Sequence, residues 1–192
     1  RKITYKEAMR FKEEFDFTDA ISISTRVSGA ATLKHGSEKT QPNISVMGCD
    51  AEYFDCSGYD FIYGRNFSDT EERYGRPVVV ISNKIAELLF PTINDPTGKI
   101  ISAGASKYTV IGVLRDKGSS MSFGGDKICM IPLTNVRQHY LRRNASFTLS
   151  VMANSVPEME NAISEATGTF RVIRQVEAKL ETNFEIIRSD SV

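Results

Sequence analysis

Short strand-type segments separated by turn residues fill most of this 192-residue chain, and longer helical periodicity is confined to its two ends. Uninterrupted apolar runs are only a few residues long, as at 78–81, whereas a helix needs roughly 20 apolar residues to cross a bilayer. The apolar side chains therefore have to be buried between short strands and amphipathic helices. We expect no membrane span within these 192 residues.

The N-terminal region predicts a helix followed by two strands. Thr4 and Glu7 fit a capping box, and the helix that follows should extend to about Asp16. Residues 20–27 alternate between apolar and polar side chains, which is the period of a half-buried strand. A second strand at about 39–47 should pair with the first one.

The segment between residues 50 and 145 predicts short strands and helices in alternation. Asp50 is placed to cap a short helix, and Gly64 to Asp69 has the composition of a surface turn. Ser82 should cap a helix that ends before Pro91. Gly112, inside a β-rich run, suggests a bulge or a close backbone contact. The remaining elements are strands at 78–81, 99–103, 107–114 and 127–131 and helices at 84–90 and 133–140.

The C-terminal region predicts a strand and a long helix. Residues 147–152 alternate as a strand does, and Ser155 to Glu158 fit a second capping box. Apolar residues then recur at steps of three and four, which predicts a helix over 156–180. Gly168 should weaken its middle by about 1 kcal/mol relative to alanine. Residues 184–187 predict a final short strand or an extended exit.

This order of elements predicts an α+β fold with two subdomains. A helix and two strands at the start of the chain and a strand and a helix at its end are compatible with helix-on-sheet packing, and they flank an insertion of mixed α/β type. A chain of this length can bury one ordinary core or two small ones. No repeat and no low-complexity linker divides it.

The charge balance argues against nucleic acid as a partner. Lysine and arginine number 24, as do aspartate and glutamate, so the formal net charge is zero and no overall basic field attracts phosphates. Hydrophobic residues make up 41% and charged residues 25%, the proportions of a folded globular domain. The chain should therefore fold and should not bind nucleic acid.

The sequence predicts no catalytic, cofactor-binding or metal-ligating residue. Its two histidines, His35 and His139, have no histidine or cysteine partner at the spacing of a metal site. Gly98 and Lys99 do not belong to a phosphate-binding loop, because the glycine and the hydroxyl that such a loop requires are absent at the matching positions. We therefore expect the domain itself to be non-catalytic.

A glycine-bounded loop at 118–125 is the candidate contact for a partner or for cargo. The loop is polar and carries two apolar side chains, and loops set on a rigid sheet commonly carry binding residues. The alternative is a long hairpin connection without a binding role. The candidate contact residues are Ser119, Ser120, Met121, Ser122 and Phe123.

The three cysteines leave two interpretations open. A disulfide between Cys49 and Cys56 requires an oxidising compartment and a geometry that spacing cannot establish. The general burial of free cysteine instead favours small buried side chains at these positions and at Cys129.

Several short blocks in residues 46–114 stand in a distinctive order. They are Val46-Met47-Gly48-Cys49-Asp50-Ala51-Glu52-Tyr53-Phe54, Gly64-Arg65-Asn66-Phe67, Val78-Val79-Val80-Ile81, Leu88-Leu89-Phe90, Pro96-Thr97-Gly98-Lys99 and Val110-Ile111-Gly112-Val113-Leu114. Together these blocks resemble the MacB-like periplasmic core domain, the extracytoplasmic part of ABC transporter permeases of the MacB, FtsX and LolC type. The resemblance implies that 1–49 and 146–192 form a porter-like subdomain and that 50–145 is inserted into it.

The resemblance also implies a function. The chain would be the domain between the first and second transmembrane helices of a permease, on the periplasmic side of the bacterial inner membrane. It would transmit an ATP-driven conformational change to a periplasmic substrate or partner, with helices 4–16 and 156–180 as levers. A roughly 20-residue apolar span is expected before Arg1, with three more after Val192. The isolated domain should be a monomer.

The implied partners are a cytoplasmic ABC ATPase and a second permease copy. A periplasmic adaptor with an outer-membrane duct is a further candidate, as is lipoprotein or peptide cargo, and the sequence does not choose among efflux, lipoprotein extraction and signalling. Two alternative functions remain. One is a peptide- or ligand-sensing module of a permease-type signalling complex, and the other is a hydrolase with a degenerate site near 118–125.

Overall fold

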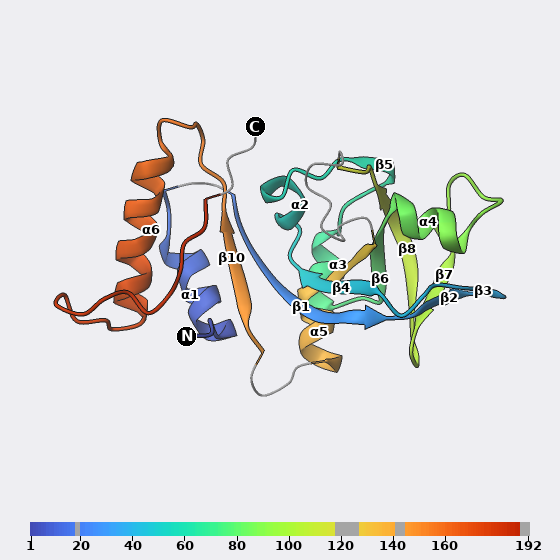
Figure 1. The fold of residues 1–192 in the computed structure, drawn as a ribbon, viewed down its shortest axis with the longest axis horizontal. Helices are drawn as coiled ribbons and strands as arrows, with labels where there is room; N and C mark the ends of the chain where they lie inside the picture. Colours follow the sequence, from blue (N-terminus) through green and yellow to red (C-terminus); the bar gives the residue numbers. More distant parts are fainter. Residues whose placement is uncertain (18–19, 118–126, 141–144, 189–192) are drawn as a thin grey trace.

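One mixed sheet connects both halves of the chain. The computed structural model describes residues 1–17, 20–117, 127–140 and 145–188. The strands follow the order β10-β1-β4-β9-β6-β8-β7-β2-β3, and β5 pairs with β8. Helices α1 and α6 lie at one end of the molecule, beside β10, and the β2–β3 hairpin lies at the other end (Figure 1). The predicted α+β class is confirmed.

Within the described ranges, the elements have the following bounds. The helices are α1 (Tyr5–Glu14), α2 (Tyr53–Cys56), α3 (Asp69–Tyr74), α4 (Asn83–Leu89), α5 (Leu133–His139) and α6 (Met159–Ile173). The strands are β1 (Ile21–Ala31), β2 (Leu33–His35), β3 (Glu38–Lys39), β4 (Ile44–Cys49), β5 (Phe61–Gly64), β6 (Val78–Ser82), β7 (Ile100–Ala103), β8 (Ser106–Leu114), β9 (Ile128–Pro132) and β10 (Phe147–Val151). None of these helices is both long and apolar enough to cross a membrane.

Strand β1 extends from the helical end of the molecule to the central sheet (Figure 1). Its first half pairs antiparallel with β10, where Ile21 lies opposite Val151 and Ile23 opposite Leu149. It also pairs with β4, and register shifts between Arg26 and Ala31 interrupt this ladder. Such shifts bend a strand and increase its twist. The strand predicted at 20–27 is confirmed and continues to Ala31, but its predicted half-burial is wrong, because residues 21–25 are buried on both faces.

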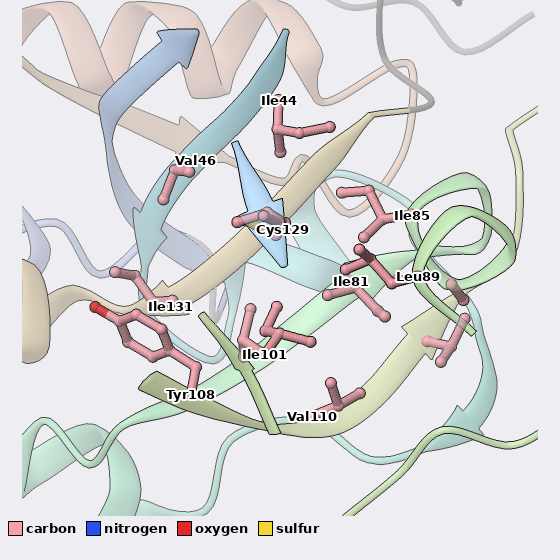
Figure 2. Close-up of a cluster of buried hydrophobic side chains, with 14 of the residues drawn as sticks. Ile44, Val46, Ile81, Ile85, Leu89, Ile101, Tyr108, Val110, Cys129 and Ile131 are labelled. Carbon is pink, nitrogen blue, oxygen red and sulfur yellow. The ribbon is translucent and has the colours of Figure 1, made fainter. Parts of the chain in front are cut away.

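The central core is a layer of aliphatic side chains from strands β4, β6, β8 and β9 and from helix α4. Strand β9 pairs parallel with β4, β6 pairs parallel with β8, and the two pairs join antiparallel between β6 and β9. Every residue of β6 is buried, as its continuous apolar sequence predicts. Ile85 and Leu89 of α4 pack beside Ile81 in this core (Figure 2).

Two local predictions in this core are confirmed. The Ser82 hydroxyl accepts a hydrogen bond from the Ile85 amide at 3.5 Å and starts α4, which ends before Pro91. A Cβ added to Gly112 would lie 2.8 Å from the Arg65 carbonyl oxygen, closer than real Cβ atoms approach backbone. Gly112 therefore provides the close backbone contact that its position suggested.

Three predictions before residue 75 are wrong in detail. The second strand spans Ile44–Cys49, while the preceding residues form the β2–β3 hairpin. Gly64 ends strand β5, and Ser68 begins helix α3 with a complete capping box that includes Glu71. Strand β5 has four residues and α3 has six, which is too short for an apolar period to be recognised. In addition, no residue of α3 is buried, so the helix has no apolar face that the sequence could show. Asp50 does not cap α2, whose N-cap is Glu52 without a side-chain hydrogen bond.

The C-terminal helix is shorter than predicted. Helix α6 spans Met159–Ile173, and the capping box at Ser155 does not form, because Glu158 is the N-cap and makes no side-chain cap. Gly168 lies within the helix without breaking it. The chain then turns at Gln175, whose φ of 53° is left-handed and ends the helix. Residues 184–187 form no strand.

The sheet shows no break at the predicted subdomain boundary. Strand β4 pairs with β1 on one side and with β9 on the other, so residues 1–49 and residues 50–145 contribute to one continuous ladder. The division of the chain at residues 49 and 145 stays a prediction.

Candidate functional site

Helices α1 and α6 pack side by side at the end of the molecule that also contains Arg1 (Figure 1). Phe11 stacks on Phe15 with ring centroids 4.8 Å apart and meets the edge of Phe170 of α6 at 5.9 Å. The Phe184 ring then contacts Phe170 edge-on at 4.8 Å. The two helices therefore share an aromatic core with each other and with the segment that follows α6.

Arg174 closes this core at the end of α6. Its side chain is fully buried, with an exposed fraction of 0%. One terminal nitrogen, Nη2, donates to the carbonyl oxygens of Lys2 at 2.8 Å and Arg1 at 3.3 Å. The other, Nη1, donates to the Asn183 carbonyl at 2.8 Å, and Nε lies 3.2 Å from the Glu7 carboxylate. We call Arg174 and these four partners the terminal clamp.

Glu7 belongs both to the clamp and to the start of α1. It completes the predicted capping box, in which its carboxylate accepts from the Thr4 amide at 2.8 Å and its own amide donates to the Thr4 hydroxyl. Burial raises the pKa of Glu7, but the hydrogen bonds from Thr4 and Arg174 outweigh burial and hold the pKa below its ordinary value. The carboxylate is therefore stable in its ionised form opposite Arg174.

A second junction ties the other half of α1 to the sheet. The Lys12 ammonium lies 2.9 Å from the Asp50 carboxylate and 3.1 Å from that of Glu52. The same Asp50 oxygen accepts the Ile23 amide of β1 at 2.8 Å. Burial raises the pKa of Asp50, and the bonds from Ile23 and Lys12 offset that rise only in part. We call Lys12, Asp50, Glu52 and Ile23 the Asp50 junction.

The chain after Asp50 is bonded to the next elements. The Ala51 amide donates to the Glu72 carboxylate at 3.3 Å, and the Ala51 carbonyl accepts from the Asn66 side chain at 2.8 Å. Arg65 forms two parallel bonds to the Glu71 carboxylate, at 2.7 and 3.0 Å. Hydrogen bonds therefore connect the chain directly after Asp50 to the 65–66 segment and to α3.

The predicted contact residues Ser119, Ser120, Met121, Ser122 and Phe123 lie outside the described residues, so their binding role stays a prediction. Among the described residues, no group of three or more His, Cys, Asp or Glu side chains is arranged to hold a metal ion. The His35 ring shares a hydrogen bond with the Ile100 carbonyl oxygen at 2.8 Å and packs on Phe90, which is a structural role.

The three thiols are free. Cys49 and Cys129 are buried, as the burial habit of free cysteine predicts, and Cys56 is half-buried. The alternative disulfide between Cys49 and Cys56 is not formed. Burial raises the pKa of the Cys56 thiol to about 11 and that of Cys129 to about 12.

Sequence reasoning missed the residues that make these junctions. Arg174 follows the apolar positions of α6 and resembles any charged residue at a helix end, and Lys12 resembles a solvated lysine. Asp50 was predicted only to cap a short helix, but its carboxylate binds Ile23 and Lys12 instead of capping α2. The missing signal is the pairing of strands β1 and β4, which brings Asp50 beside Ile23.

Sequence comparison groups the chain with one kind of transporter component. The family model described as MacB-like periplasmic core domain matches residues 1–169. The macrolide export ATP-binding/permease protein MacB of Hahella chejuensis is 28% identical over 145 residues, covering 75% of this chain and 21% of that protein. The protein of the same name from Nitrobacter winogradskyi is 32% identical over 130 residues, covering 67% and 19%. The chain spans about a fifth of the length of these relatives.

Solved structures share the fold. The extracellular domain of the noncanonic ABC-type transporter YknZ from Gram-positive bacteria aligns with a TM-score of 0.72 at 25% identity, covering 92% of this chain and 86% of that one. The periplasmic region of MacB from Actinobacillus actinomycetemcomitans aligns with a TM-score of 0.74 at 17% identity, covering 91% and 76%. The arrangement of strands and helices is therefore that of extracytoplasmic domains of this type.

Proposed function

The chain belongs to the MacB-like periplasmic core domain family, and from that membership we propose that it transmits ATP-driven conformational change in an ABC transporter permease to a substrate or partner in the periplasm. The chemistry of ATP hydrolysis lies elsewhere in this proposal, on a cytoplasmic ATPase domain or subunit. The names of the curated relatives, ATP-binding/permease proteins, support this assignment.

The observation that carries the proposal is the attachment of α1 at both ends. Its first turn is bonded to Arg174 at the end of α6, and its last turn is bonded through Lys12 to Asp50 and the sheet. A helix held in this way is displaced as a stiff element, which is the kind of motion that hinge and shear rearrangements use. Movement at the start of α1 is thereby passed to β1 and to the chain after Asp50.

The two predicted subdomains receive different roles in this proposal. The porter-like part, 1–49 and 146–192, contains both lever helices, with the second lever now placed at Met159–Ile173. The inserted part, 50–145, is moved by them and presents its loops to the periplasm. The loop at 118–125 is the proposed contact for a partner or for cargo.

The proposed partners follow from the same membership. A second permease copy pairs with the first in the membrane, and a cytoplasmic ABC ATPase drives the pair. On the periplasmic side we propose an adaptor with an outer-membrane duct, or lipoprotein or peptide cargo, as the recipient of the movement. Efflux, lipoprotein handling and peptide handling all use the same mechanical step.

The test uses the full-length parent protein with its ATPase, reconstituted in lipid nanodiscs. A spin label replaces the exposed Lys6 in α1 of both permease copies, in a Cys56→Ser background that removes the half-buried thiol. Pulsed electron–electron double resonance then measures the distance between the two labels. It is measured without nucleotide and in the nucleotide-bound state that ATP and vanadate trap. We expect two distinct distance distributions, and identical distributions in the two states would refute the proposal.

A ligand-sensing module would give a different result. In that case the distance would respond to added peptide while ATP left it unchanged. A control label at Lys107 in β8, with the same two nucleotide states, separates movement of the whole domain from movement of α1 alone.

A further inference from the structure

Arg174 joins three parts of the chain that are far apart in sequence. Its guanidinium reaches the main chain of Lys2, 172 positions away, and the side chain and carbonyl of Asn183. Nη2 also donates to one Glu7 carboxylate oxygen at 3.4 Å, and Nε lies 3.2 Å from the other oxygen as an ion pair without a hydrogen bond. The guanidinium carbon also lies 4.7 Å from the centroid of the Phe170 ring. The side chain is therefore held on its edges and on one face.

This geometry requires arginine. The guanidinium is a planar fork with five N–H donors, so it can bond to carbonyls of two different segments and to a carboxylate at once. A lysine ammonium has the same charge but concentrates its donors at one point, and it cannot reach Lys2 and Asn183 from opposite edges of a plane. Lysine at this position would leave at least one of the two segments unbonded.

Separation of α1 from α6 is strongly disfavoured while the clamp is closed. If the first turn of α1 moved away from the end of α6, the buried Arg174 side chain would lose Glu7 and the Lys2 carbonyl together. A buried charge without its partners is unstable, so the helices can part only if Arg174 moves into water. The aromatic contact between Phe11 and Phe170 would be lost in the same movement.

Arg171 provides a natural comparison within the same helix turn. One of its terminal nitrogens donates to the carbonyls of Glu177 at 2.7 Å and Leu180 at 2.9 Å. These bonds resemble those of Arg174 in kind, but both partners lie within the segment that directly follows α6. Arg171 therefore fastens the turn after α6 to the end of that helix, instead of joining α6 to α1.

We propose that Arg174 is the positioning residue that makes the start of α1 and the end of α6 move as one body. This inference rests on the proposed function of force transmission. It adds that Arg174 is the residue through which the start of α1 and the end of α6 are displaced together. Without the clamp, movement entering through either segment would be divided between sliding of α1 against α6 and movement of the sheet.

The first experiment needs only the 192-residue chain, whose counterparts in YknZ and MacB are extracytoplasmic regions with solved structures. Spin labels at Lys6 and Val172 report the spacing of α1 and α6 in a Cys56→Ser background. The test variant is Glu7→Gln with Arg174→Met, which removes both charges together and keeps a capping side chain and the apolar contact with Phe170.

The expected result is a single narrow distance for the unsubstituted chain and for the matched control Arg171→Met. The double variant should give a distribution at least about twofold broader while its far-ultraviolet circular dichroism stays that of a folded domain. Arg174→Lys is the second variant. It should broaden the distribution as well, because lysine keeps the charge but cannot bond to Lys2 and Asn183 at the same time. An unchanged width in both variants overturns the proposal.

The second experiment separates this proposal from the proposed function. In the full-length permease, Lys6 and Val172 are labelled one at a time, and each label is measured against its equivalent in the second copy, with and without ATP. We expect both labels to shift together in the unsubstituted protein and by different amounts in the double variant, with ATP hydrolysis retained. Equal shifts in the double variant overturn the role of Arg174, whereas no shift in the unsubstituted protein overturns the proposed function and leaves the first experiment to decide on the clamp.

Discussion

Replacement of Lys12 by methionine tests the Asp50 junction most directly. Methionine keeps most of the length of the lysine stem but removes the ammonium that lies 2.9 Å from the Asp50 carboxylate. The Asp50 side chain is only 5% exposed, so in the variant a buried carboxylate keeps the hydrogen bond from the Ile23 amide and loses the ammonium beside it. The perturbation is thus confined to one charge at the contact between α1 and the sheet.

The size of the effect follows from burial. Removal of one partner from a buried ion pair costs about 3–5 kcal/mol. Lys12 is 26% exposed and Asp50 keeps one hydrogen bond, so we expect a smaller loss of unfolding free energy, about 2–3 kcal/mol. In the double variant Lys12→Met with Asp50→Asn, the amide oxygen still accepts from Ile23 and no charge is buried. It should recover about 1–2 kcal/mol of that loss.

The loss should also depend on pH in a definite direction. Burial already raises the pKa of Asp50, and removal of Lys12 takes away one of the groups that offset this rise. A carboxyl whose pKa is raised by folding binds its proton more tightly in the folded state, so unfolding free energy increases as pH falls through the raised pKa. The deficit of Lys12→Met should therefore be largest near neutral pH and smaller in mild acid. Burial also raises the pKa of Glu72, and Lys12 offsets part of that rise, so removal of Lys12 acts on Glu72 in the same direction as on Asp50.

The assay is urea unfolding followed by circular dichroism at about pH 7 and at about pH 4.5, which is near the ordinary range of carboxyl groups. Arg10→Met is the matched control, because Arg10 lies on the same helix and pairs with Glu14 in an exposed position. The control should change the unfolding free energy by less than about 0.5 kcal/mol. A Lys12→Met loss no larger than that of the control, or one that is equal at both pH values, would refute the reasoning.

Three further predictions follow from single positions. Gly64→Ala should lower the unfolding free energy by about 2–4 kcal/mol in a urea titration, because φ is 72° and the new Cβ would overlap the Ile111 carbonyl oxygen. The bonds from Arg65 hold the pKa of Glu71 at about 2. Arg65→Met should therefore raise the pKa of Glu71 toward its ordinary range, which a carboxyl NMR titration measures. The stability that Arg65 adds is present near neutral pH and is lost as pH falls toward about 2. Burial raises the pKa of Cys129 to about 12, so this thiol should stay unmodified by iodoacetamide in the folded domain and react only after unfolding. Prompt labelling of Cys129 itself in the native protein would contradict its burial.

Local patterns predicted many of the elements, because they depend on residues close in sequence. Thr4 and Glu7 form their capping box within one helical turn, and Ser82 starts α4 with one hydrogen bond from the Ile85 amide, also within one turn. The alternation at 20–27 and the apolar run at 78–81 each indicated a strand. The second is fully buried as predicted, whereas the first was predicted to be half-buried and is buried on both faces over residues 21–25. The same reasoning failed at α6, where an apolar period continued to 180 although the helix ends at Ile173. A periodic sequence does not show where tertiary contacts turn the chain.

The candidate site was less predictable than the fold. The predicted contact loop at 118–125 drew attention because of its composition, whereas the terminal clamp depends on one arginine that composition does not distinguish from its neighbours. Arg174 and Lys2 meet only because α1 and α6 lie side by side, and Asp50 and Ile23 meet only because β1 pairs with β4.

The amino-acid sequence by itself determined that the chain consists of short strands with amphipathic helices near its two ends, and that its formal net charge is zero. Only the tertiary structure decided that Arg174 is a fully buried link between the two ends of the domain and that Asp50 fastens α1 to the sheet. The physical reason is one of range. Helix and strand preferences act between neighbouring residues, whereas the cost of burying a charge and the choice of its partners depend on which distant segments the fold brings together.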